Sequence, residues 1–159
     1  MQLDAVGLPY IVFSVRHAAS SDDPSLHFHY ARFDGKDWHE HEMAHAGTRL
    51  YWNQIDYTGL AALDPRDPNT LYLSTDADPQ TGAPLVSWAD GAVHHEIFRG
   101  RTADRGATWT WEALTEDSAT DNLRPVVATW DGHLALLWLR GEYHSMLRYE
   151  QDVVGLIDP

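Results

Sequence analysis

The sequence contains no cysteine, which excludes disulfide bonds and thiolate metal sites. No apolar run approaches the roughly 18 residues needed to cross a bilayer. The N-terminus also lacks a basic segment followed by an apolar one. Neither a membrane anchor nor a signal peptide is therefore predicted. The lack of cysteine does not identify the compartment, because a large secreted β protein can fold without disulfides.

Positive charge is also scarce, since 11 basic residues stand against 24 acidic ones and the net charge is −13. Such a charge repels a nucleic-acid backbone and an anionic membrane surface, so neither is an expected partner. Lysine occurs once, at Lys36, and arginine carries nearly all the remaining positive charge. The planar guanidinium group suits bidentate contact with carboxylates, which makes an acidic ligand compatible with this composition.

Sustained helical spacing of apolar residues is missing too, so no long helix is predicted. Short β-branched or aromatic stretches separated by turn residues predict an all-β chain. The expected strands are Pro9 to Val15, Leu26 to Phe33, Trp38 to Met43, Gly59 to Leu63, Leu71 to Thr75, His95 to Gly100, Thr108 to Leu114, Pro125 to Thr129, His133 to Leu139 and Ser145 to Gln151.

One motif is specific. The stretch Thr102-Ala-Asp-Arg-Gly-Ala-Thr-Trp109 fits the Asp-box pattern Ser/Thr-x-Asp-x-Gly-x-Thr-Trp. The Asp104 carboxylate can accept backbone N–H bonds across a tight hairpin, and Gly106 can adopt a positive φ. Trp109 then opens the next strand as a large apolar anchor. We expect a hairpin between the third and outer strands of a β-propeller blade, with Trp109 largely buried between blades and Asp104 in a structural role.

An internal repeat supports the propeller interpretation. Similar segments begin at Tyr10, Leu71 and Leu134, at nearly equal spacing. The chain is thus predicted to be a β-propeller fragment of about two and a half four-stranded antiparallel blades, with blade pieces at about 1–45, 56–115 and 122–159. A ten-stranded β-sandwich is the alternative, but it does not explain the repeat. Open blade faces at both ends favour self-association.

The chain resembles the C-terminal blades of the BNR-4 repeat family, β-propellers related to the propeller-type polysaccharide lyases. The resemblance covers most of residues 56–157, and residues 10–47 look like the preceding blade. Its matching stretches are Asp56 to Pro65, Leu71 to Thr75, Asp78 to Gly82, His95 to Phe98, the Asp box, Asp121 to Pro125 and Leu136 to Tyr143. Members of the family are full propellers, so this chain corresponds to their C-terminal blades only.

The resemblance implies a parent protein that binds an acidic, uronate-containing polysaccharide and could cleave it by β-elimination, in an extracellular or periplasmic location. It identifies no catalytic residue here, because the lyases draw their catalytic set largely from earlier blades. The fragment alone is expected to be inactive. The alternatives are a non-catalytic sugar-binding or scaffold propeller and a sialidase-like glycoside hydrolase, which needs a tri-arginine cluster and an acid pair.

Loops at one rim of such a propeller contain the candidate substrate-binding residues. An arginine there could hold a uronate carboxylate while a tyrosine stacks on a sugar ring. In the alternative reading the arginines Arg124 and Arg140 pair with the rim acids Asp121 and Glu142, and the inner-strand Tyr57 fills the channel. The candidates are Arg16, His17, Tyr57, Arg124, Arg140, Tyr143 and His144.

Metal sites have weaker signals. His27 and His29 alternate on one strand and His39 and His41 on the next, so the four could approach one another, with Glu40 and Glu42 on the opposite face. Solvated histidines are the preferred reading, and no metal site or cofactor is predicted. A full propeller could hold calcium, but the acidic loops here lack a defined ligand order. Sequence motifs for phosphoryl transfer, serine hydrolysis and zincin chemistry are absent.

Overall fold

The computed structural model describes residues 1–16, 26–51, 54 and 56–159. Over these residues the chain forms eleven β-strands and no helix, which confirms the all-β prediction. None of the described segments is therefore a helix that could cross a membrane.

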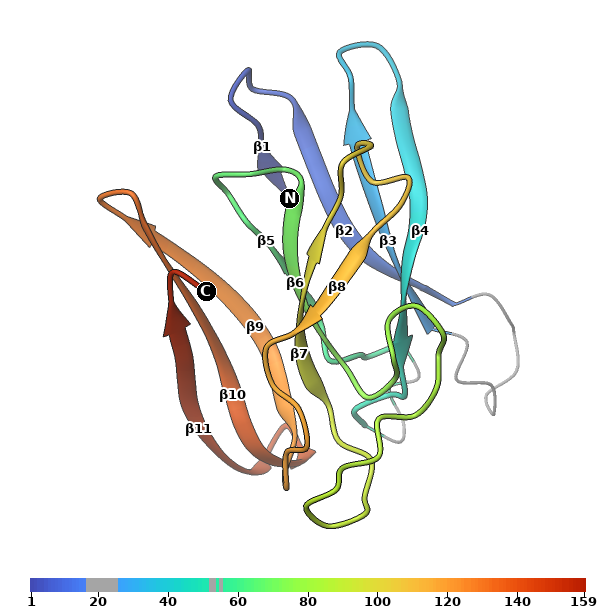
Figure 1. Cartoon of the computed structure of the whole chain (residues 1–159), viewed down its shortest axis with the longest axis vertical. Helices are drawn as coiled ribbons and strands as arrows, with labels where there is room; N and C mark the ends of the chain where they lie inside the picture. The colour runs from blue at the N-terminus through green and yellow to red at the C-terminus, as the bar shows by residue number, and fades with distance from the viewer. Residues whose placement is uncertain (17–25, 52–53, 55) are drawn as a thin grey trace.

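The strands form three antiparallel sheets that follow one another along the chain (Figure 1). In each sheet, consecutive strands are hydrogen-bonded neighbours, as in a simple meander. Sheet 1 contains β1 (Gln2–Leu3), β2 (Pro9–Arg16), β3 (Leu26–Phe33) and β4 (Trp38–Gly47). Sheet 2 contains β5 (Ala61–Leu63), β6 (Thr70–Thr75), β7 (Glu96–Arg101) and β8 (Thr110–Ala113). Sheet 3 contains β9 (Asn122–Trp130), β10 (His133–Ser145) and β11 (Arg148–Ile157).

All ten strands expected from the sequence are present, and the short β1 is an addition. The largest differences are at the last two strands, because β10 continues past Leu139 to Ser145 and β11 is Arg148–Ile157 instead of Ser145 to Gln151. The sequence does not predict the extension of β10, because the polar run Arg140 to His144 lacks the apolar alternation of a half-buried strand. Here β10 is held by its pairing with β11 rather than by burial of one apolar face.

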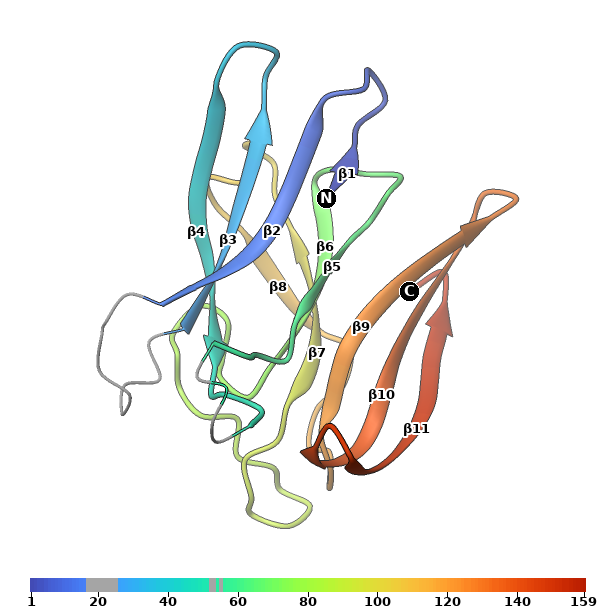
Figure 2. The same ribbon diagram turned by 180° about the vertical axis from the view of Figure 1, so that it is seen from behind.

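Sheet 2 lies between the other two sheets and is buried on both of its faces. Strand alternation directs Leu71 and Leu73 of β6 toward sheet 1, where they pack with Phe28 and Tyr30 of β3. The intervening Tyr72 points the other way and packs with Leu136 of β10. Figures 1 and 2 show the same order from opposite sides, with sheet 2 in the middle. All six residues of β6 are buried, as expected for a central strand.

The Asp box forms the expected hairpin between β7 and β8. Asp104 accepts bonds from the backbone N–H and the hydroxyl of Thr108, at 2.8 and 2.6 Å, and from the Thr102 hydroxyl. Hydrogen bonds from Thr108, followed by the one from Thr102, lower the pKa of Asp104 to about 2. Gly106 has a φ of +99°, and a Cβ there would lie 2.4 Å from the Tyr30 ring of sheet 1. Glycine is therefore required where this turn meets the neighbouring sheet.

Trp109 packs between the sheets but is only half-buried, less than expected. Its ring meets Tyr30 edge-on, with 5.3 Å between centroids, and stacks on Trp111 at 5.9 Å. The indole Nε1 donates to the Gly106 carbonyl over 3.0 Å. The anchor therefore joins sheets 1 and 2 through aromatic contacts, while part of the indole stays in solvent.

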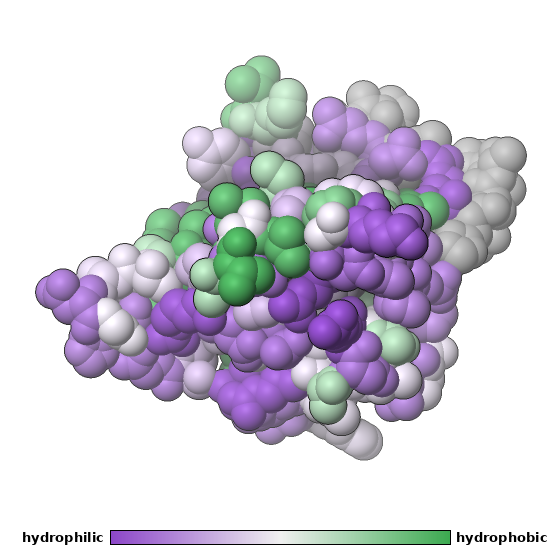
Figure 3. Space-filling view, turned by 90° about the horizontal axis from the view of Figure 1, so that it is seen from above, coloured by the Kyte–Doolittle hydropathy of each residue, from purple (hydrophilic) through white to green (hydrophobic). Residues whose placement is uncertain are grey.

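The outer face of sheet 3 is uncovered. On sheet 3 the side opposite the core carries the exposed residues Val126, Leu137, Val153 and Ile157. By contrast, the end of the molecule that carries the β3–β4 and Asp-box turns is mainly hydrophilic, with hydrophobic residues only in small groups (Figure 3). The exposed apolar surface therefore includes a sheet face rather than only turn residues.

Candidate functional site

The end of the stack opposite the Asp box gathers the long connections of the chain. The β4–β5, β6–β7 and β8–β9 connections and the β10–β11 turn all lie at this end (Figure 1). This grouping follows from the meander, because alternate connections of an antiparallel sheet lie at the same end of the strands. It brings Tyr57, Arg124 and Tyr143 together from three separate segments.

Arg124 lies against two tyrosines. Its guanidinium carbon is 5.3 Å from the centroid of the Tyr57 ring and 5.1 Å from that of Tyr143. The two rings are 6.3 Å apart and inclined at 60° to each other. Contacts at this distance are cation–π interactions. The two aromatic rings hold the guanidinium group in a defined position at this end of the strands.

The backbone explains why Arg124 projects here. The pairing of β9 with β10 shifts between Leu137 and Leu139, so two residues of β9 oppose one of β10 in a β-bulge. Arg124 has a φ of +54° in this bulge, and its N–H donates to the Gly59 carbonyl over 2.9 Å. The bulge therefore turns Arg124 out of the regular alternation and fixes it against the segment that precedes β5.

Neither Arg124 nor Arg140 forms an ion pair with an acidic side chain in the part of the chain that the structure describes. The predicted rim acids are occupied by histidines instead. Asp121 lies 3.4 Å from Nδ1 of His95, and Glu142 lies 2.9 Å from Nε2 of His144. The pairing of Arg124 and Arg140 with these acids is thus wrong for this structure. Neither guanidinium group has an acidic partner among the described residues, which favours an anionic ligand at Arg124.

Tyr143 adds an unusual feature. Its hydroxyl oxygen is buried and has no hydrogen-bond partner among the described residues. A buried hydroxyl without a partner is costly, and such groups are rare outside functional or ligand-binding sites. Its ring contacts the guanidinium group of Arg124, so a ligand that reached that cation would also be near this hydroxyl.

Arg140 does not join the tyrosines but enters a buried network. Its Nε donates to Oδ1 of Asn122 over 3.0 Å, and Trp138 Nε1 donates to the same oxygen over 2.8 Å. The Asn122 amide nitrogen donates to Glu96 Oε2 over 3.1 Å and to Ser118 Oγ over 2.9 Å. Asn122 is fully buried. The two candidate arginines therefore differ in their contacts: Arg124 lies against Tyr57 and Tyr143, whereas Arg140 is bound to the Asn122 network.

Histidines beside this network set the ionisation of Asp121. Burial raises the pKa of Asp121, but hydrogen bonds from the His95 side chain and backbone, with the charges of His95 and His94, lower it overall. For His94, burial lowers the pKa, whereas the hydrogen bond to Asp90 and the charges of Asp90 and Asp121 raise it overall. Asp121 thus remains a carboxylate and contacts the imidazoles rather than the arginines.

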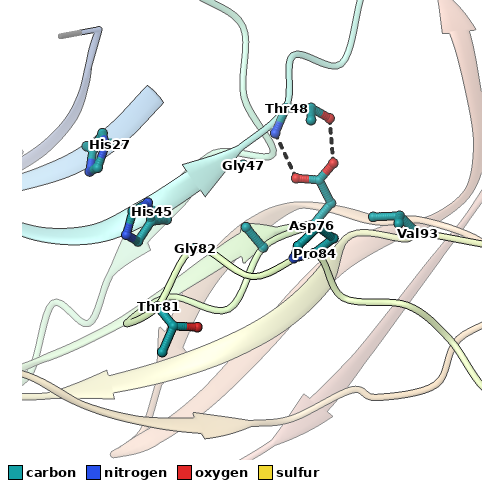
Figure 4. Close-up of a pocket in the computed structure, with 10 residues that line it drawn as sticks. His27, His45, Gly47, Thr48, Asp76, Thr81, Gly82, Pro84 and Val93 are labelled. Carbon is teal, nitrogen blue, oxygen red and sulfur yellow. Dashed lines mark hydrogen bonds between the residues drawn. The ribbon is translucent and has the colours of Figure 1, made fainter. Parts of the chain in front are cut away.

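A cavity of about 660 Å³ lies at the same end, between sheets 1 and 2. Figure 4 shows Asp76 and Thr48 on one side of it and Thr81 on another, with His27 and His45 on their strands. The Asp76 carboxylate accepts the Thr48 N–H over 2.7 Å and also the Thr48 hydroxyl. This cavity was not predicted from the sequence.

The remaining predicted residues take other positions. Arg16 donates to Oδ1 of Asp56 over 2.9 Å, so it forms an ion pair rather than an open cation. His17 lies outside the described residues. His144 is exposed and paired with Glu142. Among the described candidates, Tyr57, Arg124 and Tyr143 contact one another, and Arg140 binds the neighbouring Asn122.

The grouping of four histidines is wrong, because the turn after Phe33 sets a different register. Phe33 pairs with Trp38, so His39 lies opposite Arg32 and His41 opposite Tyr30. His27 and His29 share their face with the two glutamates instead. His29 Nδ1 is 2.9 Å from Glu40, and His27 Nδ1 is 2.9 Å from Glu42. Within the described ranges no group of three or more potential ligands is arranged to hold a metal ion.

Asp78 and Asp117, from the acidic loops, act as turn acceptors. Asp78 Oδ1 accepts the N–H groups of Gln80 and Thr81, and Asp117 Oδ1 accepts the Trp88 N–H over 2.9 Å. The Asp78 carboxylate therefore stabilises a turn within the β6–β7 connection. The Asp117 carboxylate joins that connection to the β8–β9 connection.

Known proteins offer no guide to this site. The chain has no significant match among protein-family models, curated protein sequences or solved structures.

Proposed function

We propose that the chain binds a uronate-containing saccharide through Arg124, Tyr57 and Tyr143. The observation that carries this proposal is an arginine held against two tyrosines, with no acidic partner among the described residues. Because the ring centroids are only 6.3 Å apart, both rings approach the guanidinium group from one side, and its remaining N–H donors are suited to a bidentate carboxylate. The tyrosines also offer amphipathic ring surfaces to a sugar. An acidic polysaccharide supplies both a carboxylate and a ring.

We also propose that the three sheets are successive blades of a larger β-propeller. Support comes from the meander in each sheet, the side-by-side packing of the sheets and the Asp-box hairpin. In this arrangement sheet 3 lacks an outer strand, and further blades would cover the exposed faces. The same proposal includes three further points: the similarity to the BNR-4 family, the extracellular or periplasmic location of the parent, and self-association of the isolated chain.

Cleavage by β-elimination is a second candidate, and the Tyr143 hydroxyl favours it. In such a reaction Arg124 would stabilise the charge that develops on the uronate carboxylate. A neighbouring acid–base group would take the proton from C5, the C4–O bond would break as the C4–C5 double bond forms, and a proton would pass to the leaving oxygen. We propose Tyr143, whose ring contacts Arg124, as that acid–base group. A complete propeller site uses loops from blades around the ring, so we expect binding without turnover from this chain alone.

The test compares a galacturonate trisaccharide with its fully methyl-esterified form by isothermal titration calorimetry. The two ligands have the same rings but differ in charge. We expect the acid to bind about tenfold or more tightly, because a charge-assisted bond contributes about 1.5–3 kcal/mol. This preference should weaken as salt is raised. Equal affinities for the acid and the ester would refute carboxylate recognition, and absorbance from an unsaturated uronate would establish cleavage.

A further inference from the structure

The cavity between sheets 1 and 2 is formed by the end of β4 and the connection after β6, which are joined by hydrogen bonds. The backbone N–H of His45, near the end of β4, donates to the Pro79 carbonyl over 3.0 Å. Asp76, after β6, binds Thr48 through its carboxylate and the N–H of Leu85 through its own carbonyl. The cavity walls are thus fixed by hydrogen bonds on both sides. The volume of about 660 Å³ is within the range of small-molecule sites, about 300–1,000 Å³.

Asp76 gives the cavity its chemical preference. The residue is only 7% exposed and forms no ion pair within the described parts of the chain. A carboxylate offers about four acceptor positions, and Thr48 occupies two of them. The remaining positions suit the O–H donors of a neutral ligand. An anionic group would be repelled, because none of the described residues that line this cavity is an arginine or a lysine.

Two glycines allow the polar side chains of the cavity to pack closely against its backbone walls. A Cβ on Gly47 would lie 1.8 Å from Oδ1 of Asp76, and one on Gly82 would lie 2.8 Å from the His45 ring. The His45 imidazole and the Thr81 hydroxyl add groups that can donate or accept hydrogen bonds. Val93 contributes an apolar part of the wall. Hydroxyl acceptors beside an apolar surface match the two kinds of surface on a pyranose ring.

We propose that this cavity binds a neutral sugar residue, through hydrogen bonds from its hydroxyl groups to Asp76 and with His45 and Val93 around it. The site is distinct from Arg124 but physically connected to it. Thr48 binds Asp76 at the cavity, and two residues later the Leu50 N–H donates over 2.8 Å to the carbonyl of Tyr57, the partner of Arg124. That the neutral residue belongs to the same polymer as the uronate rests on the proposed function.

The experiment uses saturation-transfer difference NMR on the full 159-residue chain. The neutral probes are the methyl glycosides of glucopyranose, galactopyranose and mannopyranose, and the acidic probe is a galacturonate trisaccharide. Val93→Phe blocks the cavity, and Val86→Phe is the matched control. Val93 and Val86 form a bridge pair and are 43% and 56% exposed, but only Val93 lines the cavity. Asp76→Asn removes the charge as a second variant.

At least one methyl glycoside should give a signal with the wild type and with Val86→Phe. That signal should fall about fivefold or more with Val93→Phe and with Asp76→Asn, whereas the galacturonate signal persists with Val93→Phe. Absence of a signal from all three glycosides, or an unchanged glycoside signal with Val93→Phe, overturns the proposal. A glycoside signal that depends on Val93, without any galacturonate binding, supports this site while rejecting the proposed uronate function.

Discussion

Asn122→Ala should lower the free energy of unfolding by at least about 3 kcal/mol. The fully buried amide accepts bonds from Trp138 and Arg140 and donates to Glu96 and Ser118. Alanine would leave the indole N–H of Trp138 without its acceptor and would remove one partner each from Arg140, Glu96 and Ser118, and each buried unsatisfied group costs about 1–3 kcal/mol. Urea unfolding followed by tryptophan fluorescence measures the change.

Asn69→Ala is the matched control. Asn69 is half-buried, and its side chain accepts one long bond, 3.4 Å, from Arg32. We expect a change below about 1 kcal/mol, because a single weak contact is lost. Similar unfolding midpoints for the Asn122 variant and the wild type would show that the network contributes little to stability.

Arg124→Asn should weaken the binding of a galacturonate trisaccharide about thirtyfold or more, because it removes the charged bidentate donor. Asparagine is chosen because Arg124 has a φ of +54°, and asparagine tolerates the left-handed region better than alanine. Arg124→Lys keeps the charge but loses the planar fork, so its affinity should fall between those of the wild type and the asparagine variant.

Arg101→Ala is the control for charge alone. Arg101 is an exposed residue at the end of β7 where the Asp-box hairpin begins, away from the tyrosines. Its loss changes the net charge by the same amount as Arg124→Asn and should leave affinity nearly unchanged. Equal losses in the two variants would mean that the saccharide responds to overall charge and not to the site at Arg124.

Local signals in the sequence were sufficient for the strands and for the Asp box. Each strand has its own alternation and flanking turn residues, and the Asp box specifies its hairpin through Asp104 and Gly106, which act within a few residues. The link between Arg124 and the tyrosines was also predictable, because a repeated meander places equivalent loops at one end. These features depend on short-range chemistry or on a periodic order.

The rest depends on register and on contacts between distant segments. The turn that pairs Phe33 with Trp38 decides which face each histidine takes, and a shift of one residue exchanges the faces. The β-bulge at Arg124 and the direction of Arg140 toward Asn122 follow from pairing across β9 and β10. The cavity beside Asp76 needs Gly47, which comes close to that carboxylate only after the sheets pack.

The most direct measurement of the central claim is a crystal structure of the chain with a galacturonate trisaccharide. The account predicts a carboxylate at hydrogen-bond distance, about 2.7–2.9 Å, from two guanidinium nitrogens of Arg124. It also predicts a sugar ring in contact with Tyr57 or Tyr143. A trisaccharide bound elsewhere, with the guanidinium N–H groups of Arg124 facing only solvent, would contradict the account.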